Sequence, residues 1–504
     1  MITISRKTTY LTAPLRPDGS VDYLAALNDR CREGVTPENN AAIPFFQAVG
    51  PKEIPETIRA EFFRMLGVPP LSAEGPYLPE PKLLVGDDGV PAVPVAWKNW
   101  SNEMVEQFEQ SLDRPWHRQQ YPLIAEFLDA NEAILAVLVK GMARPKFYLP
   151  LVAMKGEILS NVWILTCLGS SRHVAHVLRA RAMQRVAEGN AKDAWQDILA
   201  GHRLARLVAQ GPFLGDEMLA RGLETGRCGA EIVLAHYAGP TSEQLRKCRA
   251  DLRAFSPLPS VGEVSCYAER LYYLDAVCSV ALGKQEASNL AGSAPNQRDR
   301  RGDLVADLAA GGRVDWNRVL RAINSRFDQL LKALRKPTFR KRSEALAKLT
   351  GEVSTAASRM DDPAYGARLL SPRASAKEIA QQIAEVVVAF EPGIYSACVS
   401  DEMSMITHQR LTDFAFALAE YRNDLGDYPA SLGELVPRYF PELSKDPFSE
   451  QDFHYNRRGK GYILYSVGRN GRDDGGENAA WDDPRWEHET DRSKIPADIA
   501  IGTE

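Results

Sequence analysis

The chain has 504 residues, of which 44% are hydrophobic and 25% are charged, and its formal net charge is −5. These values are ordinary for a folded globular protein, and the length allows roughly two to four domains. The mildly acidic balance excludes a global electrostatic attraction to nucleic acid or to an anionic membrane. Seven cysteines without a Cys-x-x-Cys pair argue against a zinc site of the usual spacing and against a disulfide framework.

The beginning of the sequence shows no targeting signal. Met1 to Lys7 contains no apolar core of a signal peptide. No uninterrupted run of about 18 apolar residues, which a spanning helix needs, is visible in the sequence. By this N-terminus the protein is expected to be cytoplasmic.

Residues 1–95 are rich in proline and glycine, so this segment is expected to hold only short helices. Leu15 to Gly19 has the composition of a turn. From residue 96 the apolar residues recur with a period of 3.6, which predicts a helical body over 96–283. Gly211-Pro212 and Gly239-Pro240 separate its helices, and this rhythm predicts stacked helical hairpins.

The composition changes over 284–314, where small polar residues and arginine predominate and an exposed linker is expected. The helical body is predicted to continue over 315–400. Its clearest apolar stripe consists of Trp316, Val319, Leu320, Ile323, Phe327, Leu330 and Leu334. The basic run that follows, from Arg335 to Arg342, is interpreted as a solvated face rather than as a nucleic-acid site.

The last hundred residues combine one helix with short strands. The helix is predicted from about 401 to 423, and two strand-like runs joined by a hairpin loop follow at Phe453–Asn456 and Tyr462–Val467. A small α+β module is therefore expected over 401–490, with an irregular tail at 491–504. The predicted fold class is mainly α: a multi-helix body of stacked hairpins with a small C-terminal module of one helix and a short antiparallel sheet.

Six short segments in this module carry a family resemblance. They are Gly426-Asp-Tyr-Pro429, Ser431-Leu-Gly-Glu-Leu-Val-Pro437, Lys445-Asp-Pro-Phe448, Phe453-His-Tyr455, Gly461-Tyr-Ile-Leu-Tyr-Ser-Val-Gly468 and Asn470-Gly-Arg-Asp-Asp-Gly-Gly476. With the amphipathic helix before them, they resemble the globular domain of type II secretion major pseudopilins. The resemblance covers about 405–476 and implies the fold of that domain, a long helix with a short antiparallel sheet.

The resemblance also implies a metal site. In the pseudopilin family the C-terminal loop binds calcium, and the matching ligand positions here are the carbonyl of Val467, the side chain of Asn470 and the carboxylate of Asp482. Oxygen ligands of this kind suit calcium. The alternative interpretation of the same residues is a solvated acidic tail.

The resemblance further implies a cellular setting. A working pseudopilin needs a long apolar N-terminal helix, whereas this module follows about 400 residues of other sequence, so it is interpreted as a borrowed domain rather than a pilus subunit. The whole chain also resembles large bacterial envelope proteins that carry this tail and start with a membrane anchor. Membrane association is therefore expected only through an anchor ahead of the segment that begins at Thr3, and the protein would then face outward in the envelope.

Three histidines are candidates for chemistry. His173 and His176 are three positions apart on a predicted helix and so share a face, where they could hold a metal if a third ligand joined them. The alternative interpretation is a pair of surface or packed histidines. His202 lies on the apolar stripe of Trp195 and is interpreted as a hydrogen-bonded core histidine, with a catalytic base as the alternative. The sequence contains no nucleophile elbow, Walker loop or Gly-x-Gly-x-x-Gly motif.

Three functions are consistent with these observations. The first is a non-catalytic, envelope-associated scaffold that binds an unidentified protein partner and no nucleic acid. The second is an accessory component of a type II secretion-like apparatus, which would contact pseudopilins through the C-terminal module. The third is a metal-dependent enzyme built around His173, His176 and His202.

Overall fold

The N-terminal part of the chain folds into short helices around an aromatic core. In the computed structural model, the described residues are 2–79, 100–154, 156, 158–159, 162, 168–237, 239–291, 300–389, 391–477 and 497–503. The short helices are α1 (Tyr23–Arg32), α2 (Ala42–Val49), α3 (Glu56–Leu66), α4 (Asn102–Gln110), α5 (Pro122–Ala130) and α6 (Glu132–Gly141). Phe46 packs edge-on against Phe62 and Phe63, an arrangement that aromatic rings favour.

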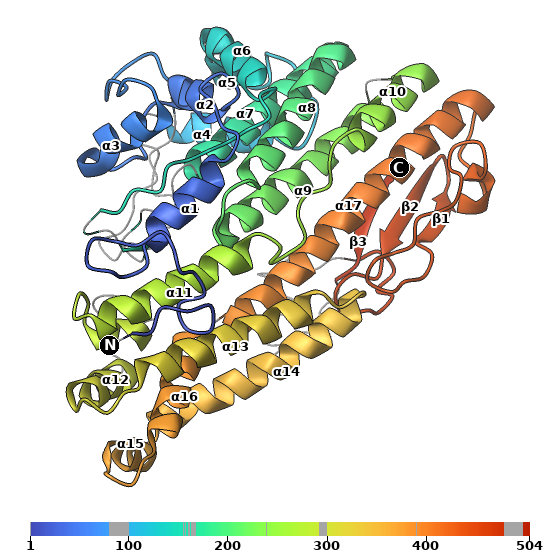
Figure 1. Cartoon of the computed structure of the whole chain (residues 1–504). Coiled ribbons are helices and arrows are strands. Elements are labelled where there is room, and N and C mark those ends of the chain that lie inside the picture. The colour runs from blue at the N-terminus through green and yellow to red at the C-terminus, as the bar shows by residue number, and fades with distance from the viewer. Residues whose placement is uncertain are drawn as a thin grey trace.

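Three long helices follow and lie side by side (Figure 1). They are α7 (Leu168–Ala187), α8 (Ala191–Val208) and α9 (Leu214–Tyr237). The side chain of Asn190 caps α8 by accepting a hydrogen bond from the amide of Asp193. Consecutive helices therefore pack on one another here, as expected for stacked hairpins. The next helix, α10 (Ser242–Arg253), leaves this stack and packs on the late helix α17 instead.

A second group of helices forms the lower part of the molecule in Figure 1. It contains α11 (Ser265–Ala281), α12 (Arg300–Ala310), α13 (Trp316–Leu334), α14 (Phe339–Ser358), α15 (Pro363–Leu370) and α16 (Ala376–Val387), with short 3-10 turns at Ala287–Ala291 and Arg359–Asp361. The apolar stripe of α13 is buried from Val319 to Leu334, as its spacing predicts. The structure differs from the exposed linker expected over 284–314, because α12 lies within this range and buries Leu304, Val305 and Leu308.

The helix α17 (Glu391–Leu425) connects all parts of the molecule. At 35 residues it is about 52 Å long. Its first turns place Tyr395 and Val399 in the core of the lower helices. Farther along, Phe416 reaches the core of the α2–α9 region, and Phe414 and Leu418 belong to the core of the C-terminal module.

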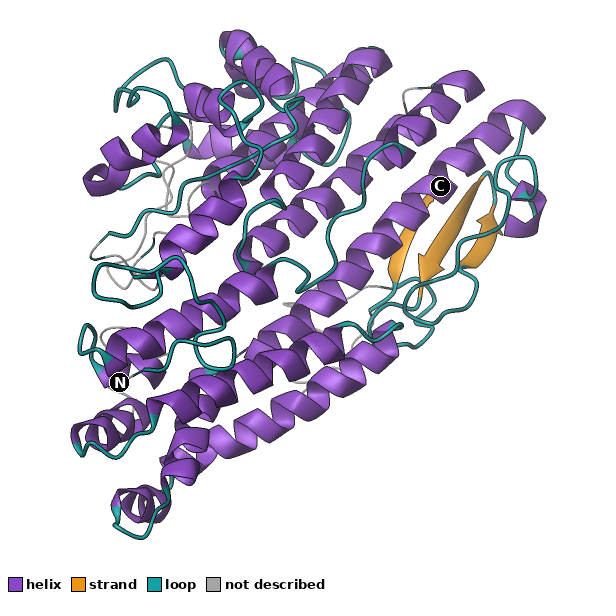
Figure 2. Ribbon diagram, in the orientation of Figure 1, coloured by secondary structure: helices purple, strands orange, loops and turns teal. Residues whose placement is uncertain are grey.

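The strands form a single antiparallel sheet beside the C-terminal half of α17 (Figure 2). They are β1 (His454–Arg458), β2 (Gly461–Ser466) and β3 (Ile499–Thr503), and a 3-10 turn at Leu432–Leu435 precedes them. Tyr455 pairs with Leu464, and Leu464 pairs with Ile501, so β2 is central. Tyr462 and Leu464 are buried against the helix, because alternate residues of a strand share one face.

The boundaries of this module differ from those expected. Its helix begins at Glu391 rather than near 401, and its third strand, β3, lies in the segment 491–504 that was expected to be an irregular tail. β3 pairs with β2 along its full length. The chain therefore needs its last residues to complete the sheet.

One described helical stretch is long and apolar enough to cross a membrane by length and composition alone. This stretch, Ala376–Leu425, comprises α16 and α17, and 65% of its most apolar window is buried inside the fold. A core helix of a globular protein has the same two properties. They do not by themselves indicate a membrane span.

Replacing Phe414 by alanine tests whether α17 holds the module together. Phe414 is 1% exposed and packs against Phe440 and Phe453, so we expect Phe414→Ala to lower the free energy of unfolding by about 3–5 kcal/mol. The matched control is Leu425→Ala on the same helix, where the side chain is 58% exposed and the change should stay within about 0.5 kcal/mol. Chemical denaturation followed by circular dichroism measures both, and equal losses would contradict the expected role of Phe414.

Candidate functional site

A concentrated group of buried charges is centred on His202. Its helix, α8, packs on α9, which contributes Glu224 and Glu231 seven residues apart on one face. Nδ1 of His202 lies 2.8 Å from Oε2 of Glu224, and Nε2 lies 2.5 Å from Oε1 of Glu231. All three residues are buried. The imidazole is therefore held from both sides by carboxylates.

Further donors stabilise the carboxylate of Glu224. Arg206, one turn after His202 on α8, donates to both of its carboxylate oxygens at 2.9 and 3.1 Å. From α17, the amide of Gln409 donates to Oε1 at 2.7 Å. The buried Arg227 lies against Gly201, where an added Cβ would come within 2.5 Å of Cδ of that arginine. Glycine at 201 therefore makes room for the arginine between α8 and α9.

The electrostatics fix the protonation of this group, which we call the His202 cluster (His202, Arg206, Glu224 and Glu231). Burial alone would lower the pKa of His202, but the charges of Glu224 and Glu231 and their hydrogen bonds raise it to about 9. Burial likewise opposes the ionisation of Glu224, yet His202 and Arg206 lower its pKa to about 2. His202 is thus an imidazolium at neutral pH with both nitrogens donating. It has no free nitrogen with which to accept a proton from a substrate.

The structure gives the other two histidines separate surroundings. His173 is buried among Trp100, Phe108 and Phe127, and its Nε2 lies 2.9 Å from the carbonyl of Pro79. Burial lowers its pKa to about 4. His176 is exposed on the same helix. Within the described part of the chain, no group of three or more His, Cys, Asp or Glu side chains could hold a metal ion.

Two glutamates connect the N-termini of α9 and α11. Glu217, in the first turn of α9, accepts hydrogen bonds from the amides of Gly262 and Ser265 at the start of α11. Conversely, Glu269 of α11 accepts one from the amide of Leu214 at the start of α9. Each glutamate thereby satisfies amides that have no partner within their own helix. Burial and then the charge of Glu391 raise the pKa of Glu269 to about 8.

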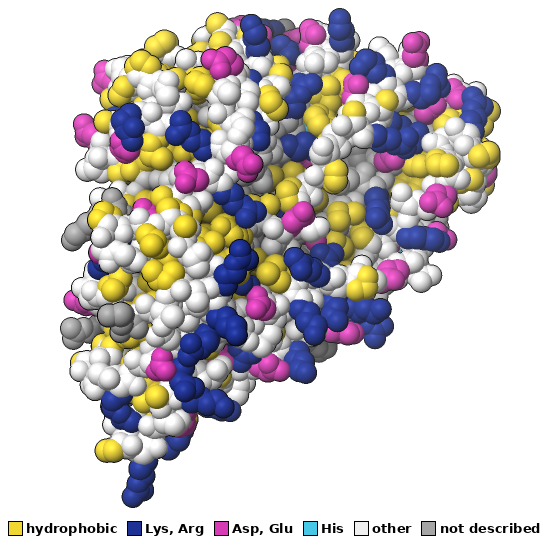
Figure 3. Space-filling model, in the orientation of Figure 1, with side chains coloured by type: hydrophobic (Ala, Val, Ile, Leu, Met, Phe, Trp, Pro, Cys, Tyr) yellow, Lys and Arg dark blue, Asp and Glu magenta, His cyan; other side chains and the backbone are white. Residues whose placement is uncertain are grey.

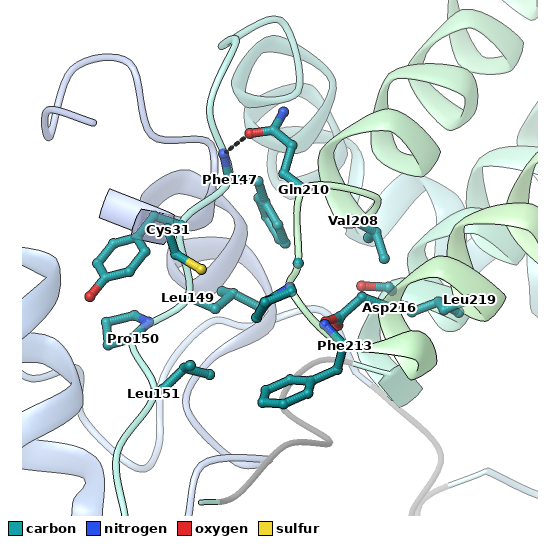
Figure 4. A pocket seen from close by; sticks show the side chains of 14 residues that line it. Cys31, Phe147, Leu149, Pro150, Leu151, Val208, Gln210, Phe213, Asp216 and Leu219 are labelled. Atoms are coloured by element: carbon teal, nitrogen blue, oxygen red, sulfur yellow. Dashed lines mark hydrogen bonds between the residues drawn. The ribbon is translucent and has the colours of Figure 1, made fainter. Parts of the chain in front are cut away.

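A pocket lies close to this junction, between the N-terminal helices and the start of α9 (Figure 4). Cys31 and Asp216 face it from opposite sides, and Gln210 closes its upper end by accepting a hydrogen bond from the amide of Phe147 at 3.0 Å. Burial raises the pKa of Cys31 to about 11 and that of Asp216 to about 7. The space available to water is about 30 Å³, which accommodates one or two ordered waters rather than an organic substrate.

The predicted calcium ligands lie in part on a loop at the end of the sheet. Val467 and Asn470 begin this loop, and Asp482 lies outside the described residues. The loop closes on Asp498, which precedes β3: its Oδ2 accepts hydrogen bonds from the amides of Asp474 and Gly476 at 2.9 and 2.8 Å. Asp498 is fully buried, and no donor among the described residues reaches its Oδ1.

Some of the oxygen atoms in this loop already accept hydrogen bonds and are therefore less suited to bind a cation. The amide of Asn470 donates to Oδ2 of Asp474 at 2.7 Å, while its own oxygen accepts from the amide of Arg472. Burial raises the pKa of Asp498, as expected for a carboxylate without a compensating cation. Asp498 was not predicted as a site residue, because it lies in the segment expected to be a tail. Its position after the acidic stretch that follows Gly476 was the only signal.

The His202 cluster makes stability depend on pH in a defined direction. The pKa of His202 is about 9 in the folded state and about 6.5 in an unfolded chain. Its contribution, on the order of 3 kcal/mol, is fully present below pH 6.5 and is lost as the pH rises through 9. We therefore expect the free energy of unfolding to fall between pH 7 and 9.5, and to fall less in His202→Gln.

The control for this experiment is His117→Gln, because His117 is exposed and should leave the alkaline slope unchanged. Guanidinium titrations at several pH values measure all three proteins. An alkaline slope that is the same in the wild type and in His202→Gln would contradict the assigned protonation.

Comparisons with known proteins do not add a relative to these observations. No protein-family model, no curated protein and no solved structure matches the chain. The residues and their geometry are therefore the basis for any functional conclusion.

Proposed function

We propose that this protein is a non-catalytic scaffold that holds its C-terminal helix-and-sheet module rigidly on a helical body and binds a protein partner there. The observation that carries this proposal is the set of ion pairs between α10 and α17. Arg249 lies 2.6 Å from Asp413, Arg253 lies 2.9 Å from the same carboxylate, and Arg246 lies 2.8 Å from Glu420. Several such pairs along one helix fix its orientation better than one pair would.

The sheet is arranged so that one strand remains accessible. β2 and β3 contact α17, whereas β1 lies at the outer edge, where Asn456, Arg457 and Arg458 are exposed. An exposed edge strand offers unpaired backbone groups to another chain. A partner that adds a strand or docks along β1 would therefore find a surface held in place by the body.

The pseudopilin resemblance supports an envelope setting for this scaffold. It rests on six sequence segments, and the helix followed by an antiparallel sheet is the arrangement that the resemblance implies. The second candidate, an accessory component of a type II secretion-like apparatus, follows if the partner at β1 is a pseudopilin.

Calcium binding by the loop after β2 is a separate proposal. It is supported by Oδ1 of Asp498, a buried carboxylate oxygen that no donor of the described chain reaches, since such an atom is costly unless a cation or donor meets it. Val467 and Asn470 lie at the start of the same loop, and Asp482 would be the third predicted ligand. Bound calcium would supply charge compensation and hold the loop against β3.

Site-specific crosslinking tests the scaffold. A photoreactive residue, p-benzoylphenylalanine, replaces Arg458 on β1 in cells, and a control protein carries it at the exposed Glu106 of α4. We expect a discrete covalent adduct to one protein from position 458 and none from position 106, because only the edge strand contacts the partner. Mass spectrometry of the adduct identifies that partner. No adduct from position 458, or identical adducts from both positions, would refute the proposal.

Thermal unfolding in calcium and in chelator tests the loop. Millimolar calcium should raise the melting temperature of the wild type, because a ligand that binds only the folded state stabilises it. Asp498→Asn should abolish the calcium-dependent shift, and Asp452→Asn, an exposed change in the same module, should preserve it. A wild-type melting temperature that is the same in calcium and in chelator would exclude the calcium proposal.

A further inference from the structure

A strip of unpaired cations runs along one face of the molecule, although the chain as a whole carries a net charge of −5. Figure 3 shows Lys and Arg side chains gathered in a band across the lower helices, with few acidic residues among them. We define the basic strip by exposed cations that have no ion-pair partner among the described residues: Arg6 and Lys7 of the N-terminal loop, Arg321, Lys332 and Arg335 on or next to α13, and Lys336 and Lys341 at the connection to α14 and on its first turn.

The N-terminal loop and α13 assemble the strip from distant parts of the sequence. The amide of Thr3 donates to Oδ1 of Asn317 at 2.8 Å, and the side chain of Asn324 donates to the carbonyl of Thr8 at 2.8 Å. These contacts lay the loop that carries Arg6 and Lys7 along α13. Arg321 lies between the two asparagines on the same helix, so the loop cations and the helix cations form one surface.

Helix electrostatics explain only part of this arrangement. Lys332 and Arg335 lie at the C-terminal end of α13, where cations are favourable. The next helix, α14, begins with Phe339-Arg-Lys-Arg342 and has no acidic residue in its first turn. Cations at a helix N-terminus are unfavourable. Arg340 and Arg342 are offset by ion pairs with Glu344 and Glu402, whereas Lys341 has no ion-pair partner among the described residues. Helix electrostatics therefore do not account for Lys341, which is exposed at an unfavourable position.

An open groove lies at the end of the strip and contains apolar surface. It is lined by Asp328, Leu331, Lys332, Arg335, Lys336 and Pro337. Asp328 does not cancel the positive charge of the strip, because it is paired with Arg270 at 2.6 Å. The groove thus offers cations on its walls and the side chains of Leu331 and Pro337 for contact with an apolar group.

From this placement we infer that the basic strip binds an acidic segment of a partner protein, whose carboxylates lie along α13 while one apolar side chain enters the groove. The inference rests on the proposed scaffold function and names a second contact for its partner. A concave groove accepts a side chain, whereas a lipid surface is flat. None of the residues that line the groove is aromatic, so the groove provides no ring for base stacking, which disfavours single-stranded nucleic acid.

Fluorescence anisotropy with a defined peptide tests this inference. The probe is a fluorescein-labelled peptide of ten glutamates around one leucine, and the same peptide with glutamines is the uncharged control. We expect saturable binding of the acidic peptide that weakens as sodium chloride rises, since screening reduces attraction between exposed charges. The triple variant Lys332→Glu/Arg335→Glu/Lys336→Glu should raise Kd about tenfold or more.

The matched control changes the net charge equally at another surface. Lys140→Glu/Arg172→Glu/Lys192→Glu alters exposed cations of α6, α7 and α8 and should bind the acidic peptide nearly as the wild type does. Circular dichroism and the melting temperature confirm that both triple variants fold. Equal weakening in the two variants, or no binding by the wild type, would overturn the inference.

Two further results distinguish this inference from lipid binding and from the scaffold function alone. Sedimentation of the wild type with vesicles containing 30% phosphatidylglycerol, together with no binding of the peptide, would assign the strip to lipid and overturn the proposal. The crosslink from position 458 does not depend on the strip. If that adduct forms but the peptide does not bind, the scaffold function stands and the acidic-segment inference fails.

Discussion

The architecture depends on α17 serving three hydrophobic cores at once. Tyr395 is buried among the lower helices, Phe416 beside Trp195 of α8, and Phe414 in the C-terminal module. A helix that is buried on most sides has little freedom to shift, because interiors are close-packed and respond to small changes in volume. The position of the sheet relative to the body is therefore set by one continuous element, and its partners on α10 and α14 only secure it.

Hydrogen bonds between buried charged side chains align the long helices. The His202 cluster connects α8 to α9 and, through Gln409, to α17, and Glu217 and Glu269 connect the starts of α9 and α11. Removing one partner of such a group leaves the others charged in a medium of low polarity, which is strongly unfavourable. Directional hydrogen bonds also fix the register of the helices, which apolar packing alone leaves less defined. The sequence alone therefore does not separate catalytic residues from structural ones. Here His202, whose pKa is shifted far from its usual value, is held by the structural partners Glu224 and Glu231.

Local sequence patterns predicted some elements well and missed others for physical reasons. The stripe of α13 and the two strands of the hairpin follow from periodicity, because burial on one face imposes it. The helix α12 was missed since its eleven residues lie in a stretch dominated by small and charged side chains, and packing stabilises it. The strand β3 was missed because Ile499–Thr503 pairs with β2 across a long separation in sequence. The glutamates around His202 could have been found, as their spacing of seven places both on one face of α9.

The sequence by itself determined the mainly helical class, the helix stripes and the hairpin, since these depend on residues close together in the chain. It also contained the pseudopilin-like segments, whose meaning for function stays a proposal. The tertiary structure alone decided that His202 is enclosed by two glutamates and that Asp498 closes the loop after β2. It also joined Arg6 and Lys7 to the cations of α13 in one strip. These arrangements bring together residues distant in sequence, and only the packing of helices and strands determines which of them meet.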